Sequence, residues 1–106
     1  MKIKICATTL DQTTVLYMND KKRDNILLNT KETNFSAKEF KFRVCDMVSD
    51  WPNELTDKSL DDGLTYTIVI KTDEKEVSYL FENKFPEDIY RLYDLINDVV
   101  GEVKNV

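Results

Sequence analysis

The segment EFKFRVCDMVSDW, residues 39–51, is matched 48 residues later by EDIYRLYDLINDV, residues 87–99. Each segment has a glutamate at its first position, an arginine at its fifth, and aspartates at its eighth and twelfth. The apolar residues between them recur at intervals of three and four, which is the period of one face of an α-helix. The two segments therefore predict two amphipathic helices of similar design. The matched polar positions are Glu39/Glu87, Arg43/Arg91, Asp46/Asp94 and Asp50/Asp98.

The first of these helices has clear start and stop signals. Ser36 and Glu39 form the S-x-x-E pattern of a capping box, and Phe35 and Phe40 have the spacing of a hydrophobic staple. Pro52 predicts the end of the helix, because the residue before a proline disfavours the helical conformation. The predicted apolar face consists of Phe40, Val44, Met47, Val48 and Trp51.

The second helix is predicted to begin at Pro86 and to run to about Val100. Proline is favoured at the first helical position, and Glu87 and Asp88 in the first turn would interact favourably with the helix dipole. The predicted apolar face consists of Phe85, Ile89, Leu92, Ile96 and Val99.

The charged positions of the two helices form a stripe beside each apolar face. In each stripe a glutamate precedes an arginine by four residues, the favourable orientation for a helical ion pair worth ~0.2–0.5 kcal/mol. We interpret both stripes as solvated ion pairs that point toward water, not as catalytic carboxylate pairs.

Five further segments have the composition and alternation of β-strands. They are residues 2–8, 13–18, 26–29, 64–70 and 76–81. The expected fold class is α+β: an antiparallel sheet of about four to six strands with both helices on one face. Each helix would close a strand–strand–helix unit, and the likeness of the two units fits either duplication or similar packing demands.

Length and composition favour one folded domain spanning residues 1–106. The chain has 42% hydrophobic residues, two glycines and two prolines, so it has a core and no long flexible linker. No apolar stretch has the length of a membrane span or the pattern of a secretion signal. Cys6 and Cys45 lie far apart without disulfide or metal spacing. These features predict a cytoplasmic protein with two free thiols.

Charge is distributed unevenly along the chain. Residues 1–53 contain nine basic and seven acidic side chains, whereas residues 54–106 contain six basic and thirteen acidic ones. The acidic second half would repel nucleic acid, and the basic excess of the first half is too small to follow a phosphate backbone. The balance therefore disfavours direct binding of nucleic acid and favours a protein partner with a basic surface.

Catalytic and metal-binding motifs are missing from the sequence. The chain has no histidine, so it lacks the usual general base and the commonest transition-metal ligand. The acidic segment DKSLDDG, residues 57–63, does not have the spacing of an EF-hand loop. We therefore predict no enzymatic activity, no cofactor, and no catalytic or metal-binding residue.

The acidic region around the only tryptophan is the candidate binding site. Long connections carry function more often than the scaffold does, and tryptophan is enriched among interface hot spots. A competing interpretation is that Trp51 closes the core while the acids only solvate the chain. The candidate partner-binding residues are Asp50, Trp51, Glu54, Asp57, Asp61 and Asp62.

The segments WPNE (51–54), DDGLTYTIVI (61–70) and NKFP (83–86) resemble a group of small proteins of Gram-positive bacteria and their mobile elements. That group has a tryptophan at a helix end, a DG turn, an alternating strand and an Asn-x-aromatic-Pro entry into a last amphipathic helix. This chain departs from the pattern at residues 81–82, where the group often has a glycine, and at Tyr66, where tryptophan is common. The resemblance implies the fold and no mechanism.

The sequence thus predicts a small non-enzymatic protein that binds another protein. Its most concrete form is an acidic inhibitor, of the immunity or phage anti-defence type, that blocks a basic surface of a host enzyme. An alternative is a small-ligand sensor or accessory domain with a pocket between sheet and helices, lined by Tyr66, Tyr79 or Tyr90. A third is a structural homodimer joined through sheet edges.

Overall fold

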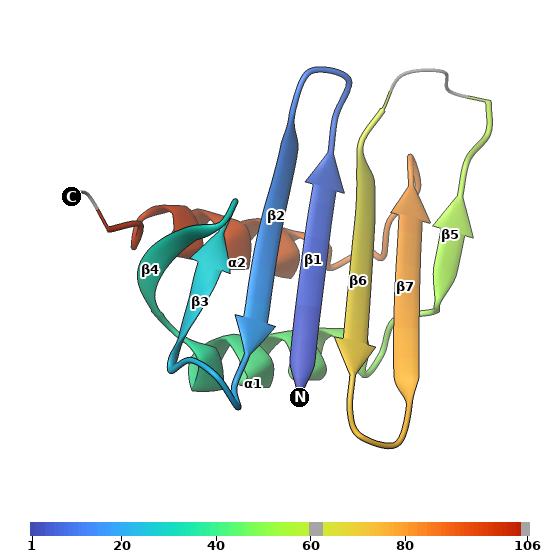
Figure 1. The fold of residues 1–106 in the computed structure, drawn as a ribbon. Coiled ribbons are helices and arrows are strands. Elements are labelled where there is room, and N and C mark those ends of the chain that lie inside the picture. The colour runs from blue at the N-terminus through green and yellow to red at the C-terminus, as the bar shows by residue number, and fades with distance from the viewer. Residues whose placement is uncertain (60–62, 105–106) are drawn as a thin grey trace.

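A computed structural model describes residues 1–59 and 63–104. Seven strands and two helices form two layers, with both helices behind the sheet in Figure 1. The principal extents of 41 × 34 × 20 Å agree with one sheet covered by one helical layer. The elements are β1 (Lys2–Thr8), β2 (Thr13–Asn19), β3 (Asn25–Leu28), β4 (Lys31–Ser36), α1 (Ala37–Val48), β5 (Glu54–Thr56), β6 (Thr65–Lys71), β7 (Glu76–Glu82) and α2 (Tyr90–Val100).

The α+β prediction is confirmed, with more strands than the expected four to six. The strand order is β4-β3-β2-β1-β6-β7-β5, and every pair is antiparallel except β5 with β7. The strands that sequence reasoning missed are β4 and β5. A hairpin followed by a helix occurs twice, as β3–β4–α1 and β6–β7–α2, but β1 and β2 also precede α1.

The start of α1 agrees with its sequence signals. The Ser36 hydroxyl accepts a hydrogen bond from the Glu39 backbone N–H at 3.2 Å, which satisfies one of the free donors of the first turn. The Phe35 and Phe40 rings pack edge to face, 6.5 Å apart. Both the predicted cap and the predicted staple are present.

The start of α2 differs from the prediction. Residues 86–89 form a turn in which the Ile89 N–H donates to the Pro86 carbonyl at 3.1 Å, and the helix begins only at Tyr90. The N-cap residue Ile89 has no side chain that can cap the helix. Asp88 is close in sequence, but its carboxylate bonds to side chains outside the cap.

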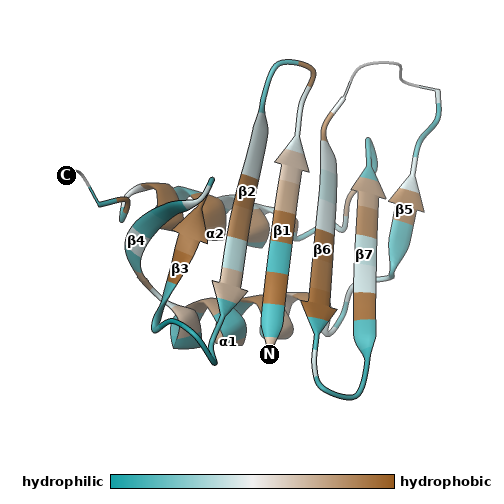
Figure 2. Cartoon of the chain, in the orientation of Figure 1, coloured by the Kyte–Doolittle hydropathy of each residue, from teal (hydrophilic) through white to brown (hydrophobic). Residues whose placement is uncertain are grey.

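The core lies between the sheet and the helices. Alternate strand residues such as Ile3, Ile5, Leu16, Ile68 and Phe81 face the helical residues Phe40, Val44, Leu92 and Leu95, all of them buried. The other face of the sheet has no helix over it (Figure 1). Figure 2 shows the resulting alternation along β1, where hydrophilic bands separate hydrophobic ones.

Reciprocal ion pairs join the two helices. The Arg43 guanidinium of α1 donates to the Asp98 carboxylate of α2 at 2.8 Å, and Arg91 of α2 donates to Asp46 of α1. The arginine side chains are 27% and 29% exposed. The prediction that both stripes point toward water is therefore wrong for the arginines, which lie between the helices. Their spacing in sequence reflects this interhelical contact.

The predicted ion pair between a glutamate and the arginine four residues later is present only in α1. Arg43 also lies 3.9 Å from Glu39, the expected partner four residues earlier. Among the described residues Arg91 instead pairs with Asp88, at 3.2 Å, and not with Glu87.

The two edges of the sheet are protected in different ways. The outer side of β4 bonds to the segment after α2: the Asn34 N–H donates to the Glu102 carbonyl at 2.8 Å, and the Lys104 N–H donates to the Glu32 carbonyl at 3.1 Å. At the other edge, β5 contains three residues. Covered and very short edge strands limit pairing with a second sheet. Neither described helix is long and apolar enough to cross a membrane.

Candidate functional site

The uncovered face of the sheet, called the open face below, is the largest surface without a second layer. Because directly paired residues point to the same side, the register identifies its members. Lys4 of β1 lies between Tyr17 of β2 and Val69 of β6, and the next row places Cys6 between Val15 and Thr67. Most of these side chains are half-buried. The open face therefore presents apolar surface at its centre, next to polar ends.

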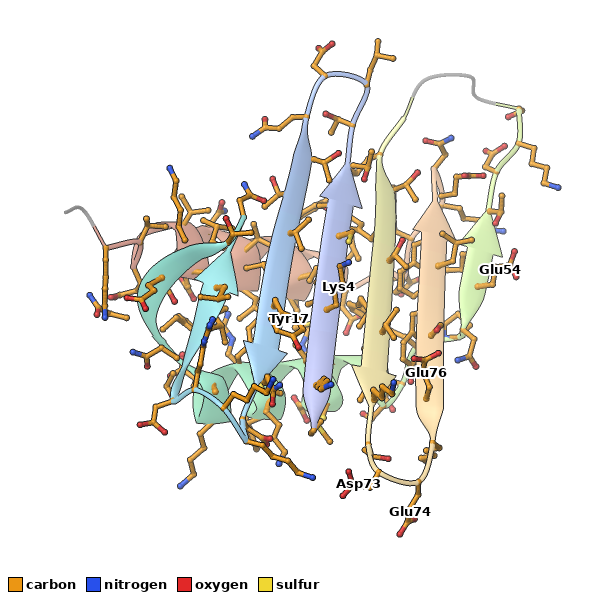
Figure 3. All side chains as sticks on the ribbon, viewed as in Figure 1. Lys4, Tyr17, Glu54, Asp73, Glu74 and Glu76 are labelled. Carbon is orange, nitrogen blue, oxygen red and sulfur yellow. The ribbon has the colours of Figure 1, made fainter. Side chains whose placement is uncertain are left out.

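Three glutamates lie on the open face at the β7–β5 side, and we call them the acidic margin: Glu54, Glu76 and Glu82. Glu54 of β5 pairs with Leu80, Glu76 pairs with Lys71, and Glu82 pairs with Thr65 and Thr56, all on the open side. In the part of the chain that the structure describes, none of the three forms an ion pair. Figure 3 shows Glu54 and Glu76 on neighbouring strands at this side.

The acidic residues predicted from the sequence lie along the same side of the molecule or outside the described residues. Asp50 is exposed just after α1, and Glu54 belongs to the acidic margin. Asp57 follows β5 and accepts hydrogen bonds from the Ser59 hydroxyl at 2.6 Å and backbone N–H at 3.0 Å, which lower the pKa of its carboxyl. Asp61 and Asp62 lie outside the described residues.

Trp51 is a core residue whose indole N–H has a specific partner. Its side chain is only 7% exposed and packs edge to face on Phe81, with ring centroids 5.5 Å apart. The indole nitrogen donates to the Asp88 carboxylate at 2.7 Å, and this bond, together with Arg91, lowers the pKa of Asp88. Trp51 therefore ties the end of α1 to the turn before α2, and it offers little surface to a partner.

Sequence reasoning missed Glu76 and Glu82 as members of the site. Both belong to β7, whose alternation in sequence does place Glu76, Ser78, Leu80 and Glu82 on one side. Nothing in the sequence places β5 beside β7, so the proximity of Glu54 to that side was not predictable.

The tyrosines of the alternative ligand-pocket prediction have different environments. Tyr66 is buried, and its ring packs against Phe85 and Tyr93 at centroid distances of 5.7 and 5.8 Å. Burial raises the pKa of its phenol. Tyr79 is partly buried against the core, whereas Tyr90 is exposed. Aromatic rings thus occupy the space beside Tyr66.

The remaining candidates for chemistry are the cysteine thiols and possible metal ligands. Burial raises the pKa of the Cys45 thiol, which lowers its thiolate fraction and its reactivity. Within residues 1–59 and 63–104, no three potential histidine, cysteine or carboxylate ligands cluster around a point that could hold a metal ion. The open face instead combines uncovered apolar side chains with charges, which is the composition of an interaction surface.

Comparison with known proteins finds no matching family model, no similar curated protein and no similar solved structure. The resemblance to small proteins of Gram-positive bacteria therefore stays a prediction, and the function is argued from the surfaces.

Proposed function

We propose that the chain is a cytoplasmic, non-enzymatic protein that binds another protein, and that the acidic margin of the open face contacts a basic surface of that partner. Asp50 and Asp57 extend the same acidic side. The most specific form of the proposal is an inhibitor that blocks a basic, substrate-binding surface of an enzyme, as immunity proteins and phage anti-defence proteins do.

The observation that carries the proposal is the position of three glutamates without ion pairs on the uncovered face of the sheet. In the helical layer, Asp46, Asp88 and Asp98 are held by the two arginines, whereas other exposed acids there, such as Glu87 and Asp94, also have no ion-pair partner among the described residues. Glu54, Glu76 and Glu82 have no such partner among the described residues, and they lie on a sheet face without a second layer. Glu54 and Glu82 lie two residues apart in the β5–β7 register, so a cationic surface that covers them relieves their repulsion, and this side is electrostatically complementary to a basic partner.

Charge supports the inhibitor form of the proposal. Residues 54–106, which contain the whole acidic margin, have six basic and thirteen acidic side chains and so carry a charge of −7, against +2 for residues 1–53. Acidic proteins of this kind associate rapidly with enzymes that use basic surfaces for nucleic acid, because long-range attraction guides the encounter.

Affinity purification from the native host, read by mass spectrometry, identifies the partner. The binding kinetics are then measured for the triple variant Glu54→Gln, Glu76→Gln, Glu82→Gln. We expect association to slow about tenfold at low salt and the salt dependence of the rate to flatten, because the steering charges are removed.

The matched control is the triple variant Glu87→Gln, Asp94→Asn, Glu102→Gln, which changes the net charge equally. These acids lie on or near α2, away from the open face, and none forms an ion pair in the described structure. The control should bind almost as the original protein does. If both variants lose the same fraction of the association rate, the effect comes from net charge alone. That result would contradict the assignment of the binding surface to the acidic margin.

A further inference from the structure

Three lysines occupy neighbouring positions on the open face, and one of them, Lys71, is directly paired with Glu76 of the acidic margin. Lys2 of β1 is directly paired with Lys71 of β6, and Lys4 lies two residues further along the same side of β1. Like charges directly opposite one another destabilise a sheet. Lys21, Lys41 and Lys104 each have a carboxylate partner, but Lys2, Lys4 and Lys71 have none within the described residues. Lys2 and Lys4 are therefore available to an external anion, and so is Lys71, which has Glu76 opposite it but forms no ion pair with it.

An apolar hollow of about 490 Å³ adjoins Lys4, which is two residues from Lys2 on β1. Its walls are the half-buried side chains of Val15, Tyr17 and Leu27, with Lys4 on one side and the β3–β4 turn on the other. Figure 3 shows Lys4 and Tyr17 side by side on neighbouring strands of this face. The hollow is large enough for one apolar side chain of a bound molecule. The lysine ammonium groups are then within reach of the groups that flank that side chain.

The wall formed by the β3–β4 turn is held in a fixed conformation. Asn29 and Thr30 both have positive φ, 47° and 69°, as the central residues of a two-residue type I′ turn do. The Asn29 side-chain oxygen accepts a hydrogen bond from the Val15 N–H at 2.8 Å, and its own N–H donates to the Val15 carbonyl at 2.8 Å. A β-branched residue with positive φ is strained, so the turn holds Thr30 against its backbone preference. The hollow is formed in advance of binding.

We propose that this hollow and the three lysines bind an acidic peptide segment of another protein. One apolar side chain of the peptide enters the hollow against Tyr17, and the carboxylates that flank it reach Lys4, Lys2 and Lys71. Burial of the apolar group and neutralisation of the lysine repulsion both favour the complex. This site is opposite in sign to the acidic margin, and it does not depend on the function proposed above.

A peptide fits the open face better than a nucleic acid does. Among the described residues, Tyr17 is the only aromatic side chain lining the hollow, whereas proteins that bind single strands stack successive bases on several aromatics. The acidic margin also lies on the same face, and it would repel a continuing phosphate chain.

The test uses an acetylated and amidated peptide, Asp-Glu-Leu-Asp-Glu, titrated into the isotope-labelled full-length protein and followed by backbone amide NMR shifts. We expect saturable shifts confined to β1, β2, β3, the β3–β4 turn and the end of β6 at Lys71, with a Kd on the order of 1 mM for so short a segment. Replacing the leucine by serine should weaken binding severalfold, because the hollow then receives no apolar group.

The variant Lys2→Gln, Lys4→Gln, Lys71→Gln should weaken binding at least about tenfold. The control Lys22→Gln, Lys38→Gln, Lys75→Gln removes three exposed lysines elsewhere and should bind almost normally. The acidic-margin variant should bind the peptide as well or better, which separates this proposal from the proposed function. Absence of saturable shifts, equal loss in both lysine variants, or tighter binding of an oligothymidylate than of the peptide would overturn the inference.

Discussion

At the scale of single residues, Trp51 illustrates how one side chain can fit two predictions from sequence. Tryptophan is enriched at binding hot spots and equally effective as a core residue with a polar end. The bond from its indole N–H to Asp88 lies between segments that are 37 residues apart in sequence, so no local pattern could reveal it. Burial and this bond place Trp51 in the scaffold that supports the acidic side.

The ionised state of Asp88 should stabilise the fold in a pH-dependent way. Its folded pKa is lowered, first by the Trp51 bond, so its contribution is present above the usual aspartate pKa of about 4 and is lost as pH falls through the folded pKa. Asp88→Asn keeps an acceptor for the indole but removes the charge near Arg91. The variant should be less stable than the original protein at pH 7, and the two should converge in acid. Denaturant melts at several pH values measure this, and a constant difference down to pH 2 would contradict it.

Replacement of the strained turn residue should stabilise the protein. Thr30→Gly relieves a left-handed conformation that costs a non-glycine residue about 1–2 kcal/mol, against a loss of about 0.5–1 kcal/mol from glycine flexibility. We expect a net gain of about 0.5 kcal/mol in the free energy of unfolding, measured by urea denaturation. Asn29→Gly is the control, and it should destabilise because it removes the bond to the Val15 N–H. Destabilisation by Thr30→Gly would mean that the threonine side chain makes a contact worth more than the strain.

At the scale of elements, sequence reasoning succeeded where signals were local and long. The start of α1 was predictable because a cap, a staple and an apolar period coincide at Ser36–Phe40. Strand β4, KETNFS, has only Thr33 and Phe35 facing the core, and β5 has three residues, so neither shows a sustained period. The start of α2 was placed too early because a proline at the first helical position also suits the turn that precedes the helix.

The interhelical ion pair between Arg43 and Asp98 should contribute modestly to stability. Its atoms are 2.8 Å apart, but the Asp98 side chain is 56% exposed, so solvent screens the interaction. A double-mutant cycle with Arg43→Met and Asp98→Asn should give a coupling energy of about 0.5–1 kcal/mol that decreases in 1 M salt. A coupling above about 3 kcal/mol, unaffected by salt, would instead indicate a buried ion pair.

At the scale of the whole molecule, the two faces of the sheet differ in their roles. One face packs against the helices to form the core, and the other carries the candidate binding residues. The helical face contains the core and the arginine ion pairs with Asp46, Asp88 and Asp98, whereas the open face keeps three glutamates and three lysines without ion pairs among the described residues. Sequence alone could suggest the acidic side from Asp50 to Asp62 because those residues are contiguous. It could not suggest the lysine cluster, since Lys2 and Lys71 come together only through the β1–β6 pairing.

The two cysteines should remain reduced and independent. Cys6 lies on the open face of β1, and Cys45 belongs to α1 behind the sheet, so the sheet layer separates them. Adding a reductant should therefore leave the Tm unchanged in a thermal melt. A decrease of several degrees would show a disulfide and would contradict both the free thiols and the proposed cytoplasmic location.

Coverage of β4 by the segment after α2 should keep the molecule from associating through that edge. A chain ending at Gly101 loses the bonds from Glu102 and Lys104 and leaves the Asn34 N–H and Glu32 carbonyl open on an edge strand. Because unpaired edge groups are satisfied by a second strand, we expect this shortened chain to self-associate with rising concentration, as measured by sedimentation velocity. A chain ending at Lys104 keeps both bonds and is the control, which should sediment like the full chain. If both shortened chains sediment like the full chain at every concentration, the covering segment has no role in protecting the edge.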